Sequence, residues 1–201
     1  MSKVKICGLS RAEDIKAVNA SLPDYAGFVF AESRRHVDER TAAKLKKDLD
    51  GCIEAVGVFV NDDIEKIIRL LDEGIIDIAQ LHGDEDEDYI RTLKENCGCR
   101  IIKSVSIGSS MPDIPKGSDY LLFDTLSAER GGTGITFDWH IIKGFDTKPY
   151  FLAGGLSTAN VREAIRLLSP YCVDVSGGVE TNGVKDAAKI KEFINIVRTA
   201  D

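Results

Sequence analysis

Two side chains that could move protons each stand where a short strand pattern ends. Cys7 ends the alternating segment 3–7 and precedes Gly8, and Asp124 ends the run 120–124. In a parallel sheet, residues at the C-terminal ends of the strands meet on one face, which is where α/β folds bind ligands. A thiol base and a carboxyl acid could therefore face the same substrate.

Each of these residues also has a purely structural interpretation. A free cysteine is often buried as a small apolar side chain, which would leave Cys7 without a role in chemistry. Asp124 could cap a loop, although a carboxylate directly after an apolar run is costly to bury unless it is paired or used. The positions of the two residues alone leave these alternatives open.

The composition is that of an ordinary globular protein. The chain has 201 residues, of which 43% are hydrophobic and 29% charged. We expect one domain over residues 1–201, although the length also fits two small domains. The sequence contains neither a membrane-spanning apolar run nor a signal-peptide pattern, so we expect a cytoplasmic protein without a membrane partner. The net charge of −7 argues against nucleic acid as a partner.

Cysteine usage indicates reduced thiols. The five cysteines are an odd number scattered through a chain without a secretory signal, which argues against a disulfide framework. Cys97 and Cys99 are separated by a single glycine, a spacing that does not fit a zinc knuckle. We interpret this segment as a loop between a helix and a strand, and we predict no metal site.

Short β-branched runs alternate with stretches of helical period along the chain, which is typical of repeated βα units. The predicted strands cover residues 3–7, 25–30, 54–60, 78–81, 100–105, 120–124, 150–153 and 171–175. The predicted helices cover residues 11–21, 38–49, a segment ending near 73, a segment opening at the acidic cluster 84–88, and residues 137–142, 158–168 and 185–198. Ser10 is the expected cap of the first helix, and Asn61 or Asp62 that of the third.

The number of units predicts how the sheet closes. About eight βα units follow one another, which predicts a single (β/α)8 TIM barrel. Segment 108–117 is too short and too broken by prolines for a full helix, so the fifth helix should be abbreviated. An open doubly wound sheet is the alternative, but no dinucleotide fingerprint follows the first strand.

A long glycine-rich loop follows the sixth predicted strand. It covers residues 125–136 and contains the run from Gly131 to Gly134. Loops of this length in a compact domain often act as lids or binding loops. We therefore consider it a candidate lid.

Two further glycine-rich loops follow the seventh and eighth predicted strands. They contain Gly154 and Gly155, and Ser176, Gly177 and Gly178. Barrels frequently bind phosphate at these two positions through backbone N–H groups, and a Cβ would hold a phosphate away from those amides. The pair of loops predicts an anion site, with simple tight turns as the alternative.

The sequence as a whole resembles the phosphoribosylanthranilate isomerase family of tryptophan biosynthesis. The resemblance covers nearly the whole chain, in order. It is carried by Lys5-Ile-Cys-Gly8, Gly27-Phe-Val-Phe30, Ser33-Arg-Arg35, Gly57-Val-Phe-Val60, Gln80-Leu-His-Gly83, Leu122-Phe-Asp-Thr125, Gly131-Gly-Thr-Gly134, Phe137-Asp-Trp139, Gly154-Gly-Leu156 and Val173-Asp-Val-Ser-Gly-Gly-Val-Glu180. The family usually has Ser-Ser-Gly at positions 176–178, so a hydroxyl at position 177 is missing here.

The resemblance implies an Amadori rearrangement of N-(5-phospho-β-D-ribosyl)anthranilate to 1-(2-carboxyphenylamino)-1-deoxy-D-ribulose 5-phosphate. It implies that Asp124 is the general acid, that Cys7 is the general base, and that Arg35 contacts the anthranilate end, where a guanidinium suits a carboxylate. No metal or organic cofactor is implied, because the substrate's own nitrogen stabilises the charge. The expected partner is a small phosphosugar, and the expected assembly is a monomer or a homodimer.

Two polar residues at strand ends are less clearly placed. His82 follows the fourth predicted strand, where it could touch the substrate or serve as a hydrogen-bonded structural histidine. Asp174 lies inside the eighth predicted strand and could point inward or outward. We expect Asp174 to hold neighbouring loops, and we leave it out of the catalytic set.

The chemistry sets a condition on the acid and the base. With reference pKa values of about 8.5 for a thiol and 3.9 for a carboxyl group, each group is mostly in the wrong form at pH 7. Helix N-termini and a nearby arginine lower thiol pKa values, so we expect a lowered pKa for Cys7. The same positive field acts on Asp124, which must then be desolvated or coupled to the thiolate.

Other phosphosugar barrels are the rival interpretations. The histidine-pathway aminoaldose isomerase normally has a carboxylate where Cys7 stands. A pentulose-phosphate epimerase would need several metal ligands, and only His82 among the histidines ends a strand. A barrel that binds a phosphosugar without converting it is the non-enzymatic alternative.

Overall fold

Eight parallel strands close into a barrel in chain order. The protein is described by a computed structural model over residues 1–126 and 136–200. The strands are β1 (Lys3–Cys7), β2 (Tyr25–Val29), β3 (Glu54–Phe59), β4 (Ile78–Leu81), β5 (Arg100–Ile107), β6 (Tyr120–Thr125), β7 (Tyr150–Leu152) and β8 (Cys172–Val175). The predicted barrel is confirmed, and the open sheet is excluded because β1 pairs with β8.

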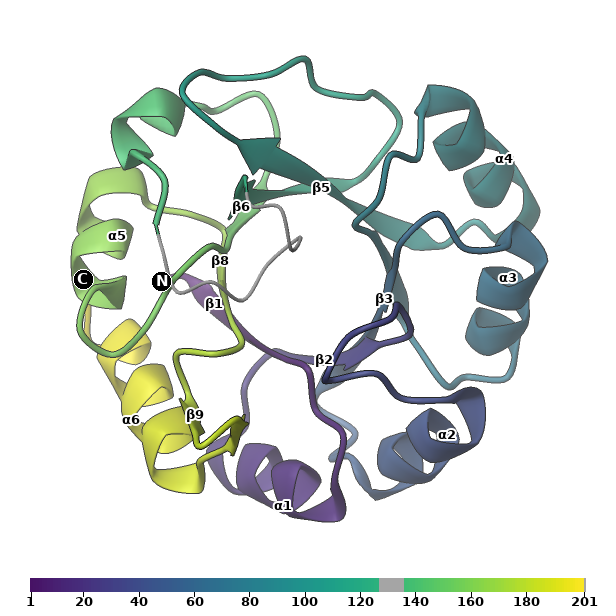
Figure 1. Cartoon of the computed structure of the whole chain (residues 1–201), viewed down its shortest axis with the longest axis horizontal. Helices are drawn as coiled ribbons and strands as arrows, with labels where there is room; N and C mark the ends of the chain where they lie inside the picture. Colours follow the sequence, from purple (N-terminus) through teal and green to yellow (C-terminus); the bar gives the residue numbers. More distant parts are fainter. Residues whose placement is uncertain (127–135, 201) are drawn as a thin grey trace.

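Helices surround the barrel on its outside (Figure 1). They are α1 (Ala12–Ser21), α2 (Glu39–Asp48), α3 (Ile64–Asp72), α4 (Glu87–Cys97), α5 (Val161–Leu168), α6 (Ala187–Arg198) and a short 3-10 helix, η1 (Trp139–Ile142). Residues 108–119 between β5 and β6 form a coil without a helix, so the abbreviated fifth unit is confirmed. The sequence did not predict the small hairpin of β9 (Glu180–Thr181) and β10 (Val184–Lys185).

Alternation along the strands separates two apolar cores. Leu122 belongs to the core inside the barrel, whereas its neighbours Leu121 and Phe123 belong to the core between the strands and the helices. Side chains two positions apart on a strand share a face, so Asp124 returns to the inner face at the rim. The same rule places Cys7 on the inner face of β1.

Two predicted helix caps are wrong by a small number of residues. The N–H of Ser10 donates to the buried carboxylate of Asp14 (3.0 Å), which reaches back from the first turn of α1. Asp63 caps α3, not Asn61 or Asp62. In both cases several polar residues precede the helix, and the tertiary position of the chain decides which of them is used.

The prediction that all cysteines are reduced is wrong for one pair. Cys97 and Cys99 form a disulfide, while Cys7, Cys52 and Cys172 are free. Gly98 ends α4 in the left-handed conformation with φ of 57° and folds the chain back on itself. This turn brings the two Cα atoms to 5.1 Å, within the span that a disulfide bridges.

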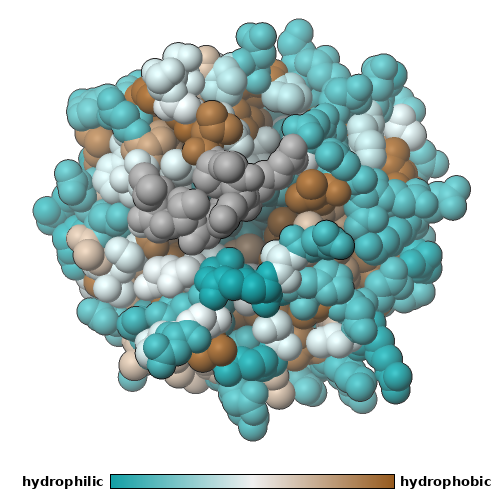
Figure 2. Space-filling model, in the orientation of Figure 1, coloured by the Kyte–Doolittle hydropathy of each residue, from teal (hydrophilic) through white to brown (hydrophobic). Residues whose placement is uncertain are grey.

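The face shown in Figure 2 is mainly hydrophilic, with hydrophobic side chains in small scattered groups. Among the described residues, the exposed large hydrophobic side chains are Met1, Leu22, Leu126 and Val184. Among the described helices, none is long and apolar enough to cross a membrane.

Candidate active site

A single cavity of about 1150 Å³ gathers the site residues that the sequence singled out. It is lined by Cys7, Arg35, His82, Asp124, Gly154, Gly155, Ser176, Gly177 and Gly178. The cavity lies at the C-terminal ends of the strands, the face where barrels of this type bind ligands. Within the described residues, no group of three or more His, Cys, Asp or Glu side chains could hold a metal ion. The candidate lid from Gly131 to Gly134 lies outside the described residues.

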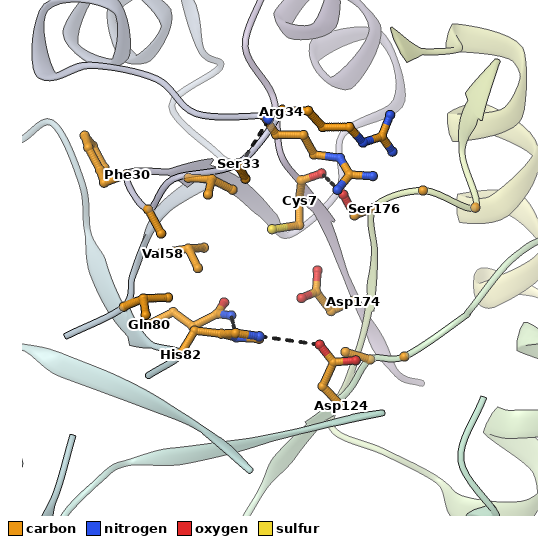
Figure 3. A pocket seen from close by; sticks show the side chains of 18 of the residues that line it. Cys7, Phe30, Ser33, Arg34, Val58, Gln80, His82, Asp124, Asp174 and Ser176 are labelled. Atoms are coloured by element: carbon orange, nitrogen blue, oxygen red, sulfur yellow. Dashed lines mark hydrogen bonds and ion pairs between the residues drawn. The ribbon is translucent and has the colours of Figure 1, made fainter. Parts of the chain in front are cut away.

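Cys7 and Asp124 face this cavity from different sides (Figure 3). Cys7 ends β1 and is paired in register with Gly27 of β2. A Cβ at position 27 would lie 2.8 Å from the sulfur of Cys7, closer than real contacts allow. Because Gly27 has no side chain, there is space for the Cys7 thiol beside β2.

A buried ion pair lies next to Cys7 inside the barrel. Lys5 is two residues before Cys7 on the same face of β1, and its Nζ donates to Oδ2 of Asp174 at 2.9 Å. Lys5 is fully buried and Asp174 is 8% exposed. Burial lowers the pKa of Lys5, but Asp174 and Cys7 raise it, and the net pKa lies above its usual value. Lys5 therefore places a fixed positive charge near the thiol.

The expected lowering of the Cys7 pKa is wrong. Burial raises the pKa of the Cys7 thiol; Lys5 and Lys185 lower it and Asp174 raises it, and the net pKa lies above the usual value. Burial removes the thiol from solvent and so disfavours a thiolate, and this loss of solvent is not visible in the sequence, whereas the positive charges are. Lys5 and Lys185 offset only part of the increase in pKa that burial causes.

Asp124 is held by a donor at one oxygen and faces a histidine with the other. Its Oδ1 accepts a hydrogen bond from the N–H of Thr125 at 2.7 Å. Its Oδ2 lies 3.5 Å from Nε2 of His82 (Figure 3). Gly154 lies against it with φ of 81°, and a Cβ there would come within 3.1 Å of Oδ1. The carboxyl group is thus fixed in orientation while it lines the cavity.

Arg35 is held by a carboxylate on the small hairpin. Its Nε and Nη2 donate to the two oxygens of Glu180 at 2.7 and 3.2 Å. Arg34 and Lys185 also contact Glu180, at 2.7 and 2.8 Å. Gly8, with φ of 79°, makes room for Arg35, because a Cβ there would collide with its side chain. These contacts keep the Arg35 guanidinium at the rim of the cavity.

Glu180 should give the protein a specific acid sensitivity. Burial raises its pKa, but Arg35 and Lys185 lower it more, to about 2 from the usual 4.5. A carboxyl group with a depressed pKa stabilises the fold fully above its unfolded pKa, and this stabilisation is lost as the pH falls from about 4.5 to about 2. We expect Glu180→Gln to lack this part of the pH dependence in denaturant unfolding measured across that range. The variant Glu95→Gln, at an exposed position, is the control, and parallel curves for wild type and Glu180→Gln would contradict the expectation.

Two glycine-rich loops form the remaining wall of the cavity. Gly154 and Gly155 both have positive φ, 81° and 65°, so their peptide groups turn in a way that L side chains rarely permit. Ser157 and Gly178 form a parallel backbone bridge that joins the loop after β7 to the loop after β8. Within the described residues, the N–H groups of Gly155 and Gly177 donate to no other backbone group. Such bare amides can bind an anion.

Several polar groups around this cavity received no role from the sequence, among them Lys5, Gln80, Glu180 and Lys185, and Asp174 was left out of the catalytic set. A lysine two residues before the thiol in a strand of an eight-stranded barrel was a usable signal, because it must share the inner face. The inward direction of Asp174 needed the register of β1 with β8, in which it lies beside Lys5.

Comparisons with known proteins agree on one family. The sequence profile described as N-(5'phosphoribosyl)anthranilate (PRA) isomerase matches residues 4–196. The N-(5'-phosphoribosyl)anthranilate isomerase of Endomicrobium trichonymphae is 50% identical over 200 residues, 99% of this chain and 100% of that protein. The crystal structure of phosphoribosyl anthranilate isomerase from Thermotoga maritima is similar with a TM-score of 0.85 and 35% identity, over 98% of this chain and 99% of that one.

A further solved structure of such an enzyme carries a ligand. It is a phosphoribosyl anthranilate isomerase in complex with reduced 1-(o-carboxyphenylamino)-1-deoxyribulose 5-phosphate. It is 32% identical, with a TM-score of 0.82, over 98% of this chain and 99% of that chain. The similarity therefore extends over essentially the full length of both chains.

Proposed function

The chain belongs to the N-(5'-phosphoribosyl)anthranilate isomerase family, and from that membership we propose how its residues perform the reaction. It is an isomerase of tryptophan biosynthesis that converts N-(5-phosphoribosyl)anthranilate to the carboxyphenylamino-deoxyribulose 5-phosphate. The reaction opens the ribose ring and moves a hydrogen from C2 toward C1. It therefore needs an acid at the ring oxygen and a base at C2.

Asp124 is the acid and Cys7 is the base in this proposal. Asp124 gives its proton to the ribose ring oxygen as the bond from C1 to that oxygen breaks and the lone pair of the nitrogen forms a protonated Schiff base. Cys7, as thiolate, takes the proton from C2, and the electrons of that bond form an enolamine. The enolamine then tautomerises to the ketone.

The placement of these two groups supports the proposal most directly. Cys7 and Asp124 line one cavity from different sides, so a substrate between them meets the acid and the base on separate flanks. Lys5 lowers the pKa of Cys7 and so favours the thiolate, the form that the base step requires, while burial keeps the net pKa of Cys7 above its usual value. The Thr125 N–H to Oδ1 bond keeps Asp124 oriented.

The two ends of the substrate are bound by different parts of the rim. Arg35 has more N–H donors than the two that Glu180 accepts, so it can also bind the anthranilate carboxylate. The loops that contain Gly154 and Gly177 bind the phosphate through their amides. Backbone binding explains how a protein of net charge −7 can hold an anion.

The remaining features complete the proposal. The protein acts as one barrel domain in the cytoplasm, on a small phosphosugar, as a monomer or a homodimer. No step in this mechanism uses a metal or an organic cofactor, because the substrate nitrogen itself delocalises the electrons. The related aminoaldose of histidine biosynthesis is not the favoured substrate.

Loss of anthranilate-type fluorescence tests substrate and reaction together. We expect the purified protein to abolish the fluorescence of N-(5-phosphoribosyl)anthranilate with saturable kinetics. The histidine-pathway aminoaldose, followed by its own absorbance, serves as the comparison substrate. Two outcomes would contradict the proposed function. One is turnover of the histidine-pathway aminoaldose without turnover of N-(5-phosphoribosyl)anthranilate. The other is that the protein binds N-(5-phosphoribosyl)anthranilate but its fluorescence does not decrease.

A further inference from the structure

His82 contacts two polar side chains, one on each ring nitrogen. Nε2 of Gln80 lies 3.1 Å from Nδ1 of His82, and Nε2 of His82 lies 3.5 Å from Oδ2 of Asp124 (Figure 3). Gln80 is 1% exposed, and the His82 side chain is 14% exposed. The three residues thus form a chain that ends at the acid.

The contact with Gln80 assigns the imidazole proton. The amide nitrogen of Gln80 is the atom that faces Nδ1 of His82, and an amide nitrogen can only donate, so in this amide orientation Nδ1 accepts. Oε1 of Gln80 is buried and has no hydrogen-bond partner among the described residues. A neutral imidazole that accepts at Nδ1 carries its proton on Nε2. The Nε2–H of His82 therefore faces the carboxyl group of Asp124.

Hydrogen bonds hold the backbone in place on both sides of His82. Its N–H donates to the carbonyl of Phe59 at 2.8 Å. Gly83, the next residue, donates its N–H to Glu85 at 2.9 Å, and its carbonyl accepts from Lys103 at 2.8 Å. Lys103 and Glu85 are themselves a buried ion pair at 2.7 Å, 3% and 1% exposed. Both peptide groups beside His82 are thus held by buried partners.

We infer that Gln80 and His82 are positioning residues for Asp124: Gln80 holds His82 in the tautomer whose Nε2–H donates to Oδ2 of the acid. This inference rests on the proposed role of Asp124. Thr125 N–H donates to Oδ1, and Nε2 of His82 lies 3.5 Å from Oδ2, so the two contacts orient the carboxyl group from both of its oxygens. Active-site hydrogen bonds are often long until the substrate binds, and we expect the 3.5 Å contact to shorten in the complex.

The arrangement also has a chemical consequence. Asp124 becomes a carboxylate when it gives up its proton, and a neutral N–H donor then gains a stronger, charge-assisted bond. His82 therefore stabilises the product of the proton transfer more than its reactant. A ring with its proton on Nδ1 would instead point a lone pair at the new carboxylate and oppose the step.

The tautomer can be measured directly by ¹⁵N NMR on histidine-labelled protein. The chain has three histidines, so the signals of His82 are identified by their loss in His82→Gln. At pH 7.5 we expect a neutral ring protonated on Nε2, with the shift of an accepting nitrogen at Nδ1. A proton on Nδ1, or a doubly protonated ring, would overturn the inference. This readout does not depend on whether Asp124 is the acid.

Kinetics of matched variants test the effect on the acid. Misplacing a catalytic group by about 1 Å can cost about 10²-fold in rate, so we expect His82→Ala to lower kcat by about 10²-fold with little change in KM. His82→Gln, whose amide nitrogen reaches about as far as Nε2, should recover most of kcat. His82→Asn, whose amide is too short to reach Asp124, should resemble His82→Ala. Equal activity in the Gln and Asn variants would overturn the positioning role.

Variants of Gln80 test the donor that sets the tautomer. Gln80→Glu replaces the donor with an acceptor of the same shape, so we expect the ring proton to move to Nδ1 and kcat to fall, with KM nearly unchanged. Gln80→Met, which removes the donor without adding an acceptor, should cause a smaller loss. Wild-type kcat and an unchanged NMR tautomer in Gln80→Glu would overturn the inference. Full activity of Asp124→Asn would instead contradict the proposed function itself.

Discussion

Asp124→Asn is expected to lower kcat by about 10³-fold, because general acid catalysis commonly contributes 10²- to 10⁴-fold. The asparagine amide has the same shape and can keep the hydrogen bond from Thr125 N–H, which is 2.7 Å long in the wild type. It cannot release a proton to the ribose oxygen as a carboxylic acid does. KM should change little, since the proposed binding of the two substrate ends by the glycine-rich loops and Arg35 does not involve Asp124.

Steady-state fluorescence kinetics on purified variants measure this effect. Asp72→Asn changes an exposed aspartate at the end of α3, outside the cavity, and should behave as wild type. A kcat for Asp124→Asn within a few-fold of wild type would remove Asp124 from the mechanism. Circular dichroism of both variants shows whether the fold is intact.

Cys7→Ser is expected to lower kcat by about 10²- to 10³-fold while product binding stays close to wild type. A hydroxyl fits the space that Gly27 leaves beside Cys7, but it is a far weaker acid than a thiol and supplies almost no oxyanion to accept the C2 proton. Cys52→Ser, which changes an exposed free cysteine, is the matched control. Unchanged turnover in Cys7→Ser would leave only a binding barrel or a different base.

The pH dependence of the wild type gives a second check on Cys7. Because its pKa lies above the usual value, little thiolate is present at neutral pH, and kcat/KM should rise as the pH increases toward that pKa. Lys5→Met removes a charge that lowers the pKa of Cys7, so this rise should move to higher pH. An unchanged profile, or a shift of the rise to lower pH, would contradict this effect of Lys5 on the thiol.

The strands and their order were predictable because their signals are local. Each strand is a short β-branched or apolar run, and the number of runs determines the barrel. The caps of α1 and α3 were not predictable to the residue, because Asp14 reaches back from inside one helix and Asp63 is one of three polar candidates at the other. Local sequence indicates that a helix begins, but packing selects the residue that caps it.

The chemistry around Cys7 required information that no local pattern carries. The pairing of Lys5 with Asp174 depends on how β1 closes against β8, at a sequence separation of 169 residues. The contact between Arg35 and Glu180 depends on a hairpin of two-residue strands, too short for a strand pattern and placed where a helix was expected to begin. Residues that line the cavity were predictable from the sequence, but the charged groups around Cys7 and Arg35 were not.

The bridge between Ser157 and Gly178 joins the loops after β7 and β8 before any substrate arrives. A binding site that is already ordered loses little conformational entropy when a ligand binds. The binding free energy of a phosphate group at these loops would therefore not be consumed in ordering the chain. In the proposed mechanism, that free energy is then available to hold the reacting ribose against Asp124 and Cys7. A riboside that lacks the phosphate should consequently have a low kcat even at saturation, because the group that aligns the ribose in the cavity would be missing.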